Sequence, residues 1–433
     1  MAALIDIIVP AYRGDSETRA CLASVRASKG TRPFELVVVD DASPEPALSA
    51  GLRDLANAGR ITLLAHAQNR GFVASVNEAM ALHTDRDVIL LNSDTEVAGD
   101  WIDRLTAHAA RDVNVATVTP FSGNATICSY PRTLEPNALP EGETTRSLDA
   151  AFAAANAGRA VPIPTAVGFC MYIARRALEC VGPFDEARYG RGYGEEVDFC
   201  MRAARAGFRH LLAGDVYVRH IGEVSFGGAG NERRVQAQAT VDALYPEFQE
   251  RLRAFLASDP PRGLRRRADL ERLRVSQRPR ELFVVDAADR RSLDAATAVA
   301  RSAAAHAEPL LLEASDAGWV LRWPRAGEEL ALFLPPGKPP RRFVALLRAI
   351  GIARVVLAES HRLAPLAGAL ARQLSCPGIG LGARASAPAM VAAPAPPGSG
   401  PAWPELPAEW LRSGAPARPS GLRRLFARLR RGG

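Results

Sequence analysis

The chain has 433 residues, of which 48% are hydrophobic and 23% charged, a composition typical of a folded globular protein rather than a disordered one. Its length exceeds what a single hydrophobic core usually covers, so we expect a main domain and a smaller one. The net charge of +7 is not evidence of nucleic-acid binding, because the basic runs lie late in the chain and lack interleaved aromatic residues.

The cysteines and the first residues of the chain indicate the cellular compartment. Six cysteines form no CxxC pair, which argues against a disulfide framework and favours a reducing environment. The chain passes from Met1 directly into the apolar run LIDIIVP, without the pattern of an export signal. No uninterrupted apolar segment approaches the roughly 18 residues that span a bilayer. We therefore expect a cytoplasmic protein.

The first hundred residues alternate between strand and helix patterns. Short β-branched runs begin at Ile5, Glu35, Ile61 and Asp87, and two helical patterns, SETRACLASVRAS and FVASVNEAMALH, lie between them. This alternation predicts an α/β fold with a mixed, mostly parallel sheet covered by helices. Ligands of such sheets gather at the carboxyl ends of the strands.

The predicted strand ends carry acidic residues. The second strand ends at Asp40 and Asp41, and the fourth is followed by Asp94. The sequence lacks a GxGxxG segment after the first strand and has no GxxxxGK[ST] segment, so a dinucleotide enzyme and a P-loop enzyme are both disfavoured. Carboxylates at these positions suit a base edge, a ribose or a divalent cation.

A second acidic group follows three glycines in GYGEEVDF, where Glu195, Glu196 and Asp198 lie within four positions. Like charges this close repel each other, so an ordinary exposed helix would spread them out. The cluster has two explanations. It could begin a helix, where acids interact well with the macrodipole, or it could face a reaction that needs a base.

Seven motifs occur in the order found in one enzyme family, which the first 230 or so residues resemble. The motifs are IIVPAYRGD, VVVDDAS, NRGFVASVNEA, LLNSDTEV with DWIDRL, VGFCMYIARRALECVGPFDE, GYGEEVDFCMRA and YVRHIGEVSFG. The resemblance is to glycosyltransferase family 2, which has the GT-A fold, and more narrowly to its bacterial rhamnosyltransferase-like members.

The resemblance implies an inverting transferase that moves a sugar from a nucleotide-diphosphate sugar to a glycan or lipid-linked acceptor. Candidate donors are dTDP-rhamnose and UDP-sugars, and the implied process is bacterial cell-envelope polysaccharide biosynthesis. Such an enzyme stabilises the departing diphosphate and removes a proton from the acceptor hydroxyl. A catalytically reduced nucleotide-binding scaffold in a polysaccharide assembly complex is the alternative.

The resemblance also assigns roles to residues. Glu196 would be the catalytic base, and Glu195 would orient it. The implied nucleotide-binding residues are Pro10, Tyr12, Asp40, Asp41, Arg70, Asn77, Asn92 and Ser93. The implied metal ligands, for Mg²⁺ or Mn²⁺, are Asp94 and His220.

The metal motif departs from the family's DxD pattern. The chain has Asn92, Ser93 and Asp94 there, so a single carboxylate remains. Mg²⁺ often keeps several waters and relies on substrate phosphates, so one carboxylate is compatible with a metal-assisted leaving group. Three residues also have plain structural explanations: Asp94 as a turn cap, Asp41 as a turn residue, and His220 as a hydrogen-bonded histidine at a strand end.

We expect five segments along the chain. They are a GT-A domain (1–255), a basic linker or helix (256–280), a small α/β accessory domain (281–383), a Pro/Ala-rich linker (384–420) and a basic amphipathic tail (421–433). The accessory segment faintly resembles the N-terminal half of a family 4 glycosyltransferase, and no donor-binding half follows it.

The tail has apolar residues at helical spacing among arginines, a pattern typical of peripheral contact with the inner face of a membrane. A solvated basic end, or a helix docked on the body of the protein, is the alternative explanation.

Overall fold

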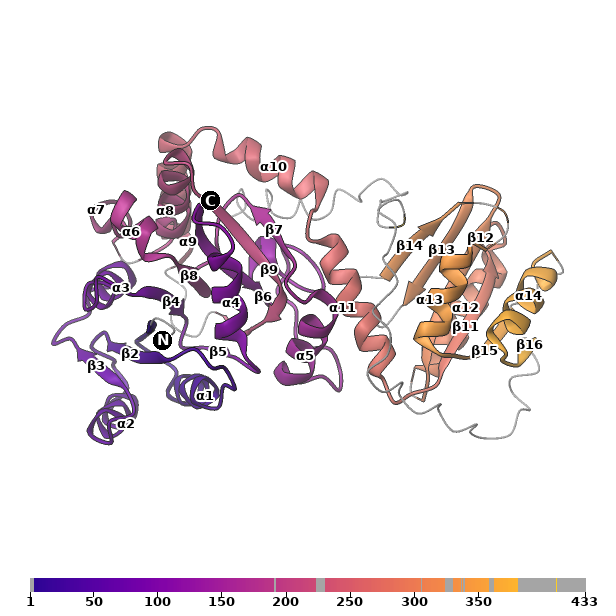
Figure 1. The fold of residues 1–433 in the computed structure, drawn as a ribbon, viewed down its shortest axis with the longest axis horizontal. Coiled ribbons are helices and arrows are strands. Elements are labelled where there is room, and N and C mark those ends of the chain that lie inside the picture. Colours follow the sequence, from indigo (N-terminus) through magenta and orange to yellow (C-terminus); the bar gives the residue numbers. More distant parts are fainter. Residues whose placement is uncertain are drawn as a thin grey trace. The chain divides into compact units, whose positions relative to one another are not determined.

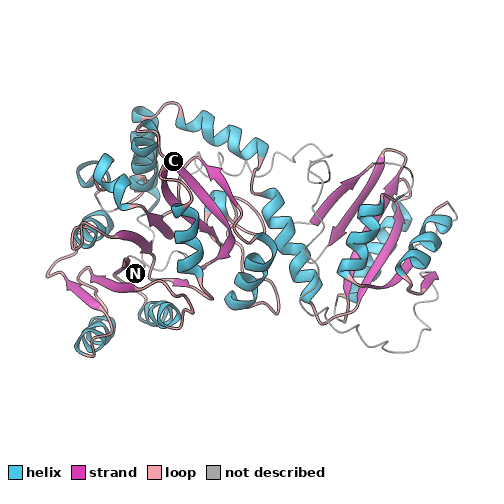
Figure 2. Ribbon diagram, in the orientation of Figure 1, coloured by secondary structure: helices cyan, strands magenta, loops and turns pink. Residues whose placement is uncertain are grey.

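A computed structural model describes residues 4–190, 192–222, 230–304, 306–323, 330–335, 337, 339–357, 362–380 and 410. The chain divides into two compact units, with the boundary between Leu264 and Arg265 (Figure 1). Each unit contains its own sheet accompanied by helices (Figure 2). The predicted tail, and all of the predicted linker except Trp410, lie outside the described residues.

The main sheet of the first unit has, within the described residues, eight strands in the order β3-β2-β1-β4-β8-β6-β9-β7. β1 to β4 are mutually parallel where they pair, β8 runs antiparallel between β4 and β6, and β7 runs antiparallel to β9. The strands are β1 (Ile5–Ala11), β2 (Phe34–Asp40), β3 (Thr62–Ala65), β4 (Asp87–Leu91), β6 (Val115–Phe121), β7 (Ala160–Ile163), β8 (Cys170–Ile173) and β9 (Arg209–Tyr217). The predicted mixed, mostly parallel α/β sheet is confirmed.

The central strands are apolar almost throughout because both faces of a parallel sheet are covered. Ile7, Val38 and Ile89, on β1, β2 and β4, have no exposed surface. The accompanying helices are α1 (Asp15–Arg26), α2 (Pro46–Asn57), α3 (Phe72–Met80), α4 (Trp101–Ala110), α5 (Thr145–Asn156), α6 (Arg175–Val181), α7 (Glu186–Tyr189), α8 (Glu195–Arg205), α9 (Gly230–Leu244), α10 (Phe248–Ser258) and the 3-10 turn Thr126–Cys128.

A separate two-stranded sheet joins distant parts of the first unit. β5 (Thr95–Glu96) pairs antiparallel with β10 (Arg219–His220), and His220 lies opposite Thr95. Because β5 directly follows the loop after β4, this pairing brings residue 220 beside the acidic end of β4.

The second unit has, among its described residues, a six-stranded sheet in the order β14-β13-β12-β11-β15-β16. Its strands are β11 (Arg280–Asp286), β12 (Glu308–Ser315), β13 (Gly318–Trp323), β14 (Leu330–Leu334), β15 (Ile352–Leu357) and β16 (Gly378–Gly380). Its helices are α11 (Arg262–Val275), which begins at the unit boundary, α12 (Arg290–Ala303), α13 (Arg341–Ile350) and α14 (Ala364–Leu374).

Parts of the predicted linkers pack into this second unit. The basic segment 256–280 contains α11, whose Leu270 and Leu273 are buried in the core of the unit. Trp410 is also buried there, with its ring edge-on to Phe343 at a centroid distance of 6.3 Å. Within the described part of the chain, no helix is both long and apolar enough to cross a membrane.

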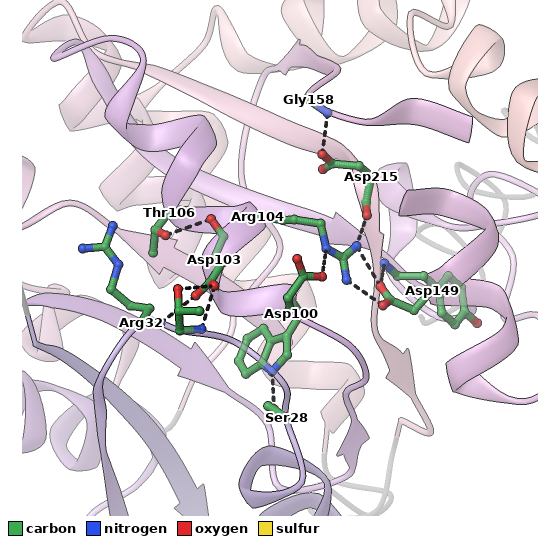
Figure 3. A network of polar contacts seen from close by, with 12 residues as sticks. Ser28, Arg32, Asp100, Asp103, Arg104, Thr106, Asp149, Gly158 and Asp215 are labelled. Atoms are coloured by element: carbon green, nitrogen blue, oxygen red, sulfur yellow. Dashed lines mark hydrogen bonds and ion pairs between the residues drawn. The ribbon is translucent and has the colours of Figure 1, made fainter. Parts of the chain in front are cut away.

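A buried polar network in the first unit fixes α4 against the sheet (Figure 3). The Arg104 guanidinium donates to Asp100 at 2.7 Å, to Asp149 at 2.6 Å and to the backbone carbonyl of Asp215. The Asp215 carboxylate lies 2.7 Å from Nε2 of His108 and accepts from the Gly158 amide at 2.7 Å. The network therefore connects α4, α5, β9 and the turn before β7.

We predict that Arg104→Met destabilises the first unit by about 3–5 kcal/mol, because it leaves the buried Asp149 carboxylate without its cation. Arg209→Met, which removes an exposed ion pair with Asp112, should leave the stability of the unit almost unchanged. Guanidinium unfolding of both variants measures the difference. Equal losses would show that the buried network does not stabilise this unit as described.

Candidate active site

The predicted nucleotide residues meet at one edge of the main sheet. Pro10 lies in β1, Tyr12 follows that strand, and Asp40 ends β2. The Asp41 amide donates to the Ala11 carbonyl at 3.0 Å, which ties the ends of β1 and β2 together. The loop after β4, which holds Asn92, Ser93 and Asp94, reaches the same edge because β4 runs parallel to β1.

Asp40 and Asp41 have different surroundings. The Asp40 carboxylate accepts from the Ser43 amide at 2.8 Å and from the Ser49 hydroxyl at 2.5 Å, so it shapes its own turn. The buried Asp41 carboxylate reaches the segment before α3. Its Oδ1 accepts from the Arg70 amide at 2.7 Å, and its Oδ2 accepts from the Gly71 amide at 2.8 Å.

Arg70 and Asn77 make contacts within the protein. The Arg70 guanidinium pairs with Glu78 and is about half exposed. The Asn77 amide binds both backbone groups of Phe184, donating to its carbonyl at 2.9 Å and accepting from its N–H at 3.1 Å. Asn77 therefore joins α3 to the segment before α7, and its role at the nucleotide stays a prediction.

Asp94 and His220 come together through the β5–β10 pairing. Nε2 of His220 lies 3.4 Å from Oδ1 of Asp94, while the Gly222 amide donates to Oδ2 of Asp94 at 2.8 Å. Burial raises the pKa of Asp94, but the His220 contact and the Gly222 amide lower it by more, so the pKa lies below its usual value. Asp94 is therefore ionised at neutral pH.

The ring of His220 is held in one orientation. Its Nδ1 lies 2.6 Å from the Asn124 carbonyl, which can only accept, so Nδ1 carries a proton. The Phe169 ring stacks on His220 at 5.2 Å, and the Phe169 carbonyl accepts from the Asn92 amide at 2.8 Å. Nε2 is then the ring nitrogen that faces Asp94, and it would be the one to bind a metal ion.

These donors fit a divalent cation. The Asp94 carboxylate oxygen and Nε2 of His220 lie 3.4 Å apart, a separation that suits two neighbouring ligands of one ion. A set of two protein ligands leaves the remaining positions to water and phosphate oxygens, as is usual for Mg²⁺. Asp94 and His220 would thus hold the Mg²⁺ or Mn²⁺ ion that the sequence predicted.

Another group with metal-ligating atoms lies at the opposite edge of the sheet. Asp6, Glu35 and His83 bring one ligand atom each within 4.8 Å of one another. The Arg86 guanidinium already lies 3.0 Å from Asp6 and 2.6 Å from Glu35. A cationic side chain therefore already pairs with both carboxylates of this group.

Glu195 and Glu196 begin α8, directly after Gly194. Gly194 has φ +89°, and a Cβ there would lie 2.9 Å from the Tyr189 ring, so the position requires glycine. The helix amino terminus favours nearby negative charge, which partly offsets the repulsion between the acids. Oε2 of Glu195 and Oε2 of Glu196 are nevertheless buried without a hydrogen-bond partner.

This environment perturbs both carboxyl groups. Burial, and then the charge of Glu196, raise the pKa of Glu195 well above its usual value. Burial also raises the pKa of Glu196. The two groups share one site, so they titrate as a pair. A carboxylate whose pKa is raised toward neutrality is a better proton acceptor than an ordinary glutamate.

The face of α8 that carries Glu196 points toward the segment before β8. Cys200, one turn after Glu196, lies on the same helix face, and its Sγ accepts from the Ala166 amide at 3.3 Å. The same segment continues to Phe169, which contacts His220 and Asn92. The segment 166–169 therefore contacts both Cys200 of α8 and the His220 ring.

Asp198 contacts a different part of the protein from the two glutamates. Its carboxylate accepts from the Tyr245 hydroxyl at 2.7 Å and from Arg202 at 2.8 Å. It is buried and fixes α8 to the residue that follows α9. Asp198 is therefore a structural acid in a motif where its two neighbours have raised pKa values.

Sequence reasoning missed His66 and Asn124. Nδ1 of His66 lies 2.8 Å from Oδ1 of Asp41, and the Asn124 carbonyl holds His220. His66 directly follows β3, so the rule that ligands gather at strand ends could have found it. Asn124 contributes only its backbone, which no residue type signals.

We predict that Glu195→Gln becomes more stable relative to the wild type as pH rises. Above the ordinary glutamate pKa of about 4.3, the unfolded chain releases a proton that folded Glu195 retains. The folded state then binds more protons, so wild-type stability falls with pH, whereas glutamine releases none. Melting temperatures between pH 4 and pH 8 measure this, with the exposed Glu250→Gln as control. A constant difference across this range would contradict the raised pKa.

Comparison with known proteins agrees with the fold. Residues 6–182 match the family model described as glycosyl transferase family 2. No curated protein gives a significant sequence match.

Several solved structures are similar at low identity. GalNAc-T7 with UDP, GalNAc and Mn²⁺ aligns at 15% identity and TM-score 0.45, over 63% of this chain and 55% of that chain. The mannosyltransferase PcManGT from Pyrobaculum calidifontis, in complex with GDP-Man and Mn²⁺, aligns at 21% identity and TM-score 0.40, over 70% of this chain and 79% of that chain. S. aureus TarS 1–349 with UDP-GlcNAc aligns at 16% identity and TM-score 0.39, over 55% of this chain and 67% of that chain.

The alignment thus spans only about half of GalNAc-T7. The family match and the observed sheet order confirm the predicted GT-A fold and, for the matched domain, the predicted enzyme class. Residues 6–182 form a glycosyltransferase family 2 domain.

Proposed function

We propose that the first unit is an inverting glycosyltransferase, which moves a sugar from a nucleotide-diphosphate sugar to a hydroxyl group of a glycan or lipid-linked acceptor. The observations that carry this proposal are the carboxylate pair Glu195–Glu196, whose pKa values are raised, and the Asp94–His220 pair beside the carboxyl end of β4. One pair suits removal of a proton, and the other suits a departing diphosphate.

The donor side uses the strand ends. Tyr12 and Pro10 would line the base, and Asp41 would accept a hydrogen bond from it. A divalent cation, when bound, supplies positive charge for the diphosphate leaving group. Asp94 would contribute one ligand and Nε2 of His220 another, while the Asn124 carbonyl and the Phe169 ring keep that imidazole oriented.

The acceptor side uses the start of α8. As the anomeric C–O bond to the diphosphate breaks, the acceptor oxygen bonds to the anomeric carbon from the opposite face and must lose its proton. Glu196 would take that proton. Glu195, buried beside it, raises the cost of ionising the pair and so keeps its proton affinity high.

The finer identity of the substrates is also part of the proposal. The rhamnosyltransferase-like motifs favour dTDP-rhamnose or a UDP-sugar as donor, and bacterial surface polysaccharide as the product. Contact of residues 421–433 with the inner membrane face, close to a lipid-linked acceptor, belongs to the same proposal. The second unit would be an accessory domain without transfer activity of its own.

We predict that Glu196→Gln lowers sugar transfer by about 10²–10⁴-fold, the usual loss when a general base is removed. Glu195→Gln should cost less, because that residue positions its neighbour. The measurement is nucleoside diphosphate release from a panel of nucleotide sugars with added acceptors. Nucleotide affinity is measured in parallel and should stay unchanged in both variants.

Asp198→Asn is the matched control within the same motif, since it should reduce stability without a comparable loss of transfer by the folded protein. Near-normal transfer by Glu196→Gln would contradict the assignment of the base. Nucleotide binding without transfer from any sugar on the panel would instead favour the non-catalytic scaffold.

A further inference from the structure

The loop 122–137, between β6 and α5, supplies the contact that holds the His220 ring. The Asn124 carbonyl in this loop lies 2.6 Å from Nδ1 of His220. The Asn124 side-chain amide also donates to the carbonyl of Ile221, the residue that follows His220, at 3.4 Å. The position of the loop therefore decides which ring nitrogen of His220 faces Asp94.

The backbone of this loop is strained. Thr126 and Leu134 both have a positive φ, at 46° and 65°, in a region that β-branched and bulky residues rarely adopt. The Leu134 amide donates to the Thr126 carbonyl at 2.9 Å, so the two strained positions are joined. Strain of this kind persists only where the surrounding contacts hold it in place, and it is concentrated at functional sites.

Asn137 provides such contacts at the end of the loop. Its backbone N–H and its side-chain Nδ2 lie 2.8 Å and 3.1 Å from the Gly123 carbonyl oxygen. Nδ2 also lies 2.9 Å from the Arg132 carbonyl and 2.7 Å from the Glu135 carbonyl. The Oδ1 atom of Asn137 accepts from the Arg132 amide at 3.3 Å. One side chain therefore joins the start of the loop to its end.

The start and the end of the loop approach too closely for a side chain at Gly123. A Cβ there would lie 2.5 Å from the Asn137 carbonyl oxygen and 3.3 Å from the Tyr217 hydroxyl oxygen. The Gly123 carbonyl belongs to the same peptide unit as the Asn124 nitrogen. Because a peptide unit is planar, the contacts that hold the Gly123 carbonyl also set the direction in which the chain enters Asn124.

We propose that Asn137 is a positioning residue of the active site, which acts through the Asn124 carbonyl to keep His220 oriented for the divalent cation. The inference rests on the proposed function, in which Nε2 of His220 is a metal ligand. A group that orients a ligating histidine typically contributes about 10- to 100-fold to metal affinity. Asn137 acts one contact further away, so we expect the lower end of that range.

Electron paramagnetic resonance of Mn²⁺, titrated into the full-length protein with UDP, dTDP and GDP in turn, measures this contribution. Asn137→Ala should weaken Mn²⁺ binding about tenfold, while the affinity for the nucleotide without metal stays unchanged. Gly123→Ala disturbs the same contact from the other side of the loop and leaves the Asn137 side chain intact. It should weaken Mn²⁺ binding as well.

The matched control is Thr133→Val in the same loop. It removes a hydroxyl group whose buried oxygen has no hydrogen-bond partner among the described residues, so Mn²⁺ affinity should stay unchanged. A second comparison uses the His220→Ala protein. Asn137→Ala should cause no further loss of Mn²⁺ affinity there, because the effect of Asn137 passes through His220.

A folded Asn137→Ala protein with wild-type Mn²⁺ affinity would overturn the inference and leave the proposed function intact. If Asn137→Ala does not fold, wild-type Mn²⁺ affinity in Gly123→Ala would overturn it equally. A tenfold loss that persists in the His220→Ala background would show that Asn137 does not act through His220. If the wild-type protein binds Mn²⁺ with none of the three nucleotides, the proposed function itself fails.

Discussion

The proposed active site depends on the short antiparallel pairing of β5 with β10. This pairing sets His220 opposite Thr95 and so beside Asp94, although the two site residues are far apart in the chain. The Gly222 amide and the Asn124 carbonyl then fix the carboxylate and the imidazole separately. A one-residue shift in this register would point the side chain of residue 220 to the other face of the ribbon.

The surroundings of the two acidic groups of the site shift their pKa values in opposite directions. Asp94 receives a backbone amide and faces an imidazole, which lower its pKa and keep it ionised. Glu195 is buried and Glu196 is half-buried beside it, and removal from water raises both pKa values. A folded protein gains no stability from the second arrangement, so a use in proton transfer explains it better than helix capping does. Asp198, in the same motif, has the hydrogen bonds expected of a structural acid.

Much of the first unit could be predicted from local sequence. The β-branched runs before Asp41 and Asp94 predict buried parallel strands, and their alternation with helices predicts that their carboxyl ends lie at one edge of the sheet. The second unit was less predictable at its ends, because the buried α11 and Trp410 lie in segments whose basic or proline-rich composition is typical of linkers.

Side-chain partners were the hardest part to predict. The Asn77 amide binds the backbone of Phe184, more than a hundred residues away, and no spacing rule links the two. The contact between His66 and Asp41 likewise depends on the pairing of β3 with β2. Such contacts follow from tertiary packing, so a sequence motif can name the residues of a site without giving their partners.

The central claim is that the carboxyl edge of the main sheet binds a nucleoside diphosphate and a divalent cation through Asp94 and His220. A crystal structure with a nucleoside diphosphate and Mn²⁺, with the metal located by its anomalous signal, tests it most directly. We predict that the Mn²⁺ lies within about 2.5 Å of an Asp94 oxygen and of Nε2 of His220, with the diphosphate completing its ligands. Mn²⁺ and nucleotide bound elsewhere, for example at Asp6, Glu35 and His83, would contradict the account.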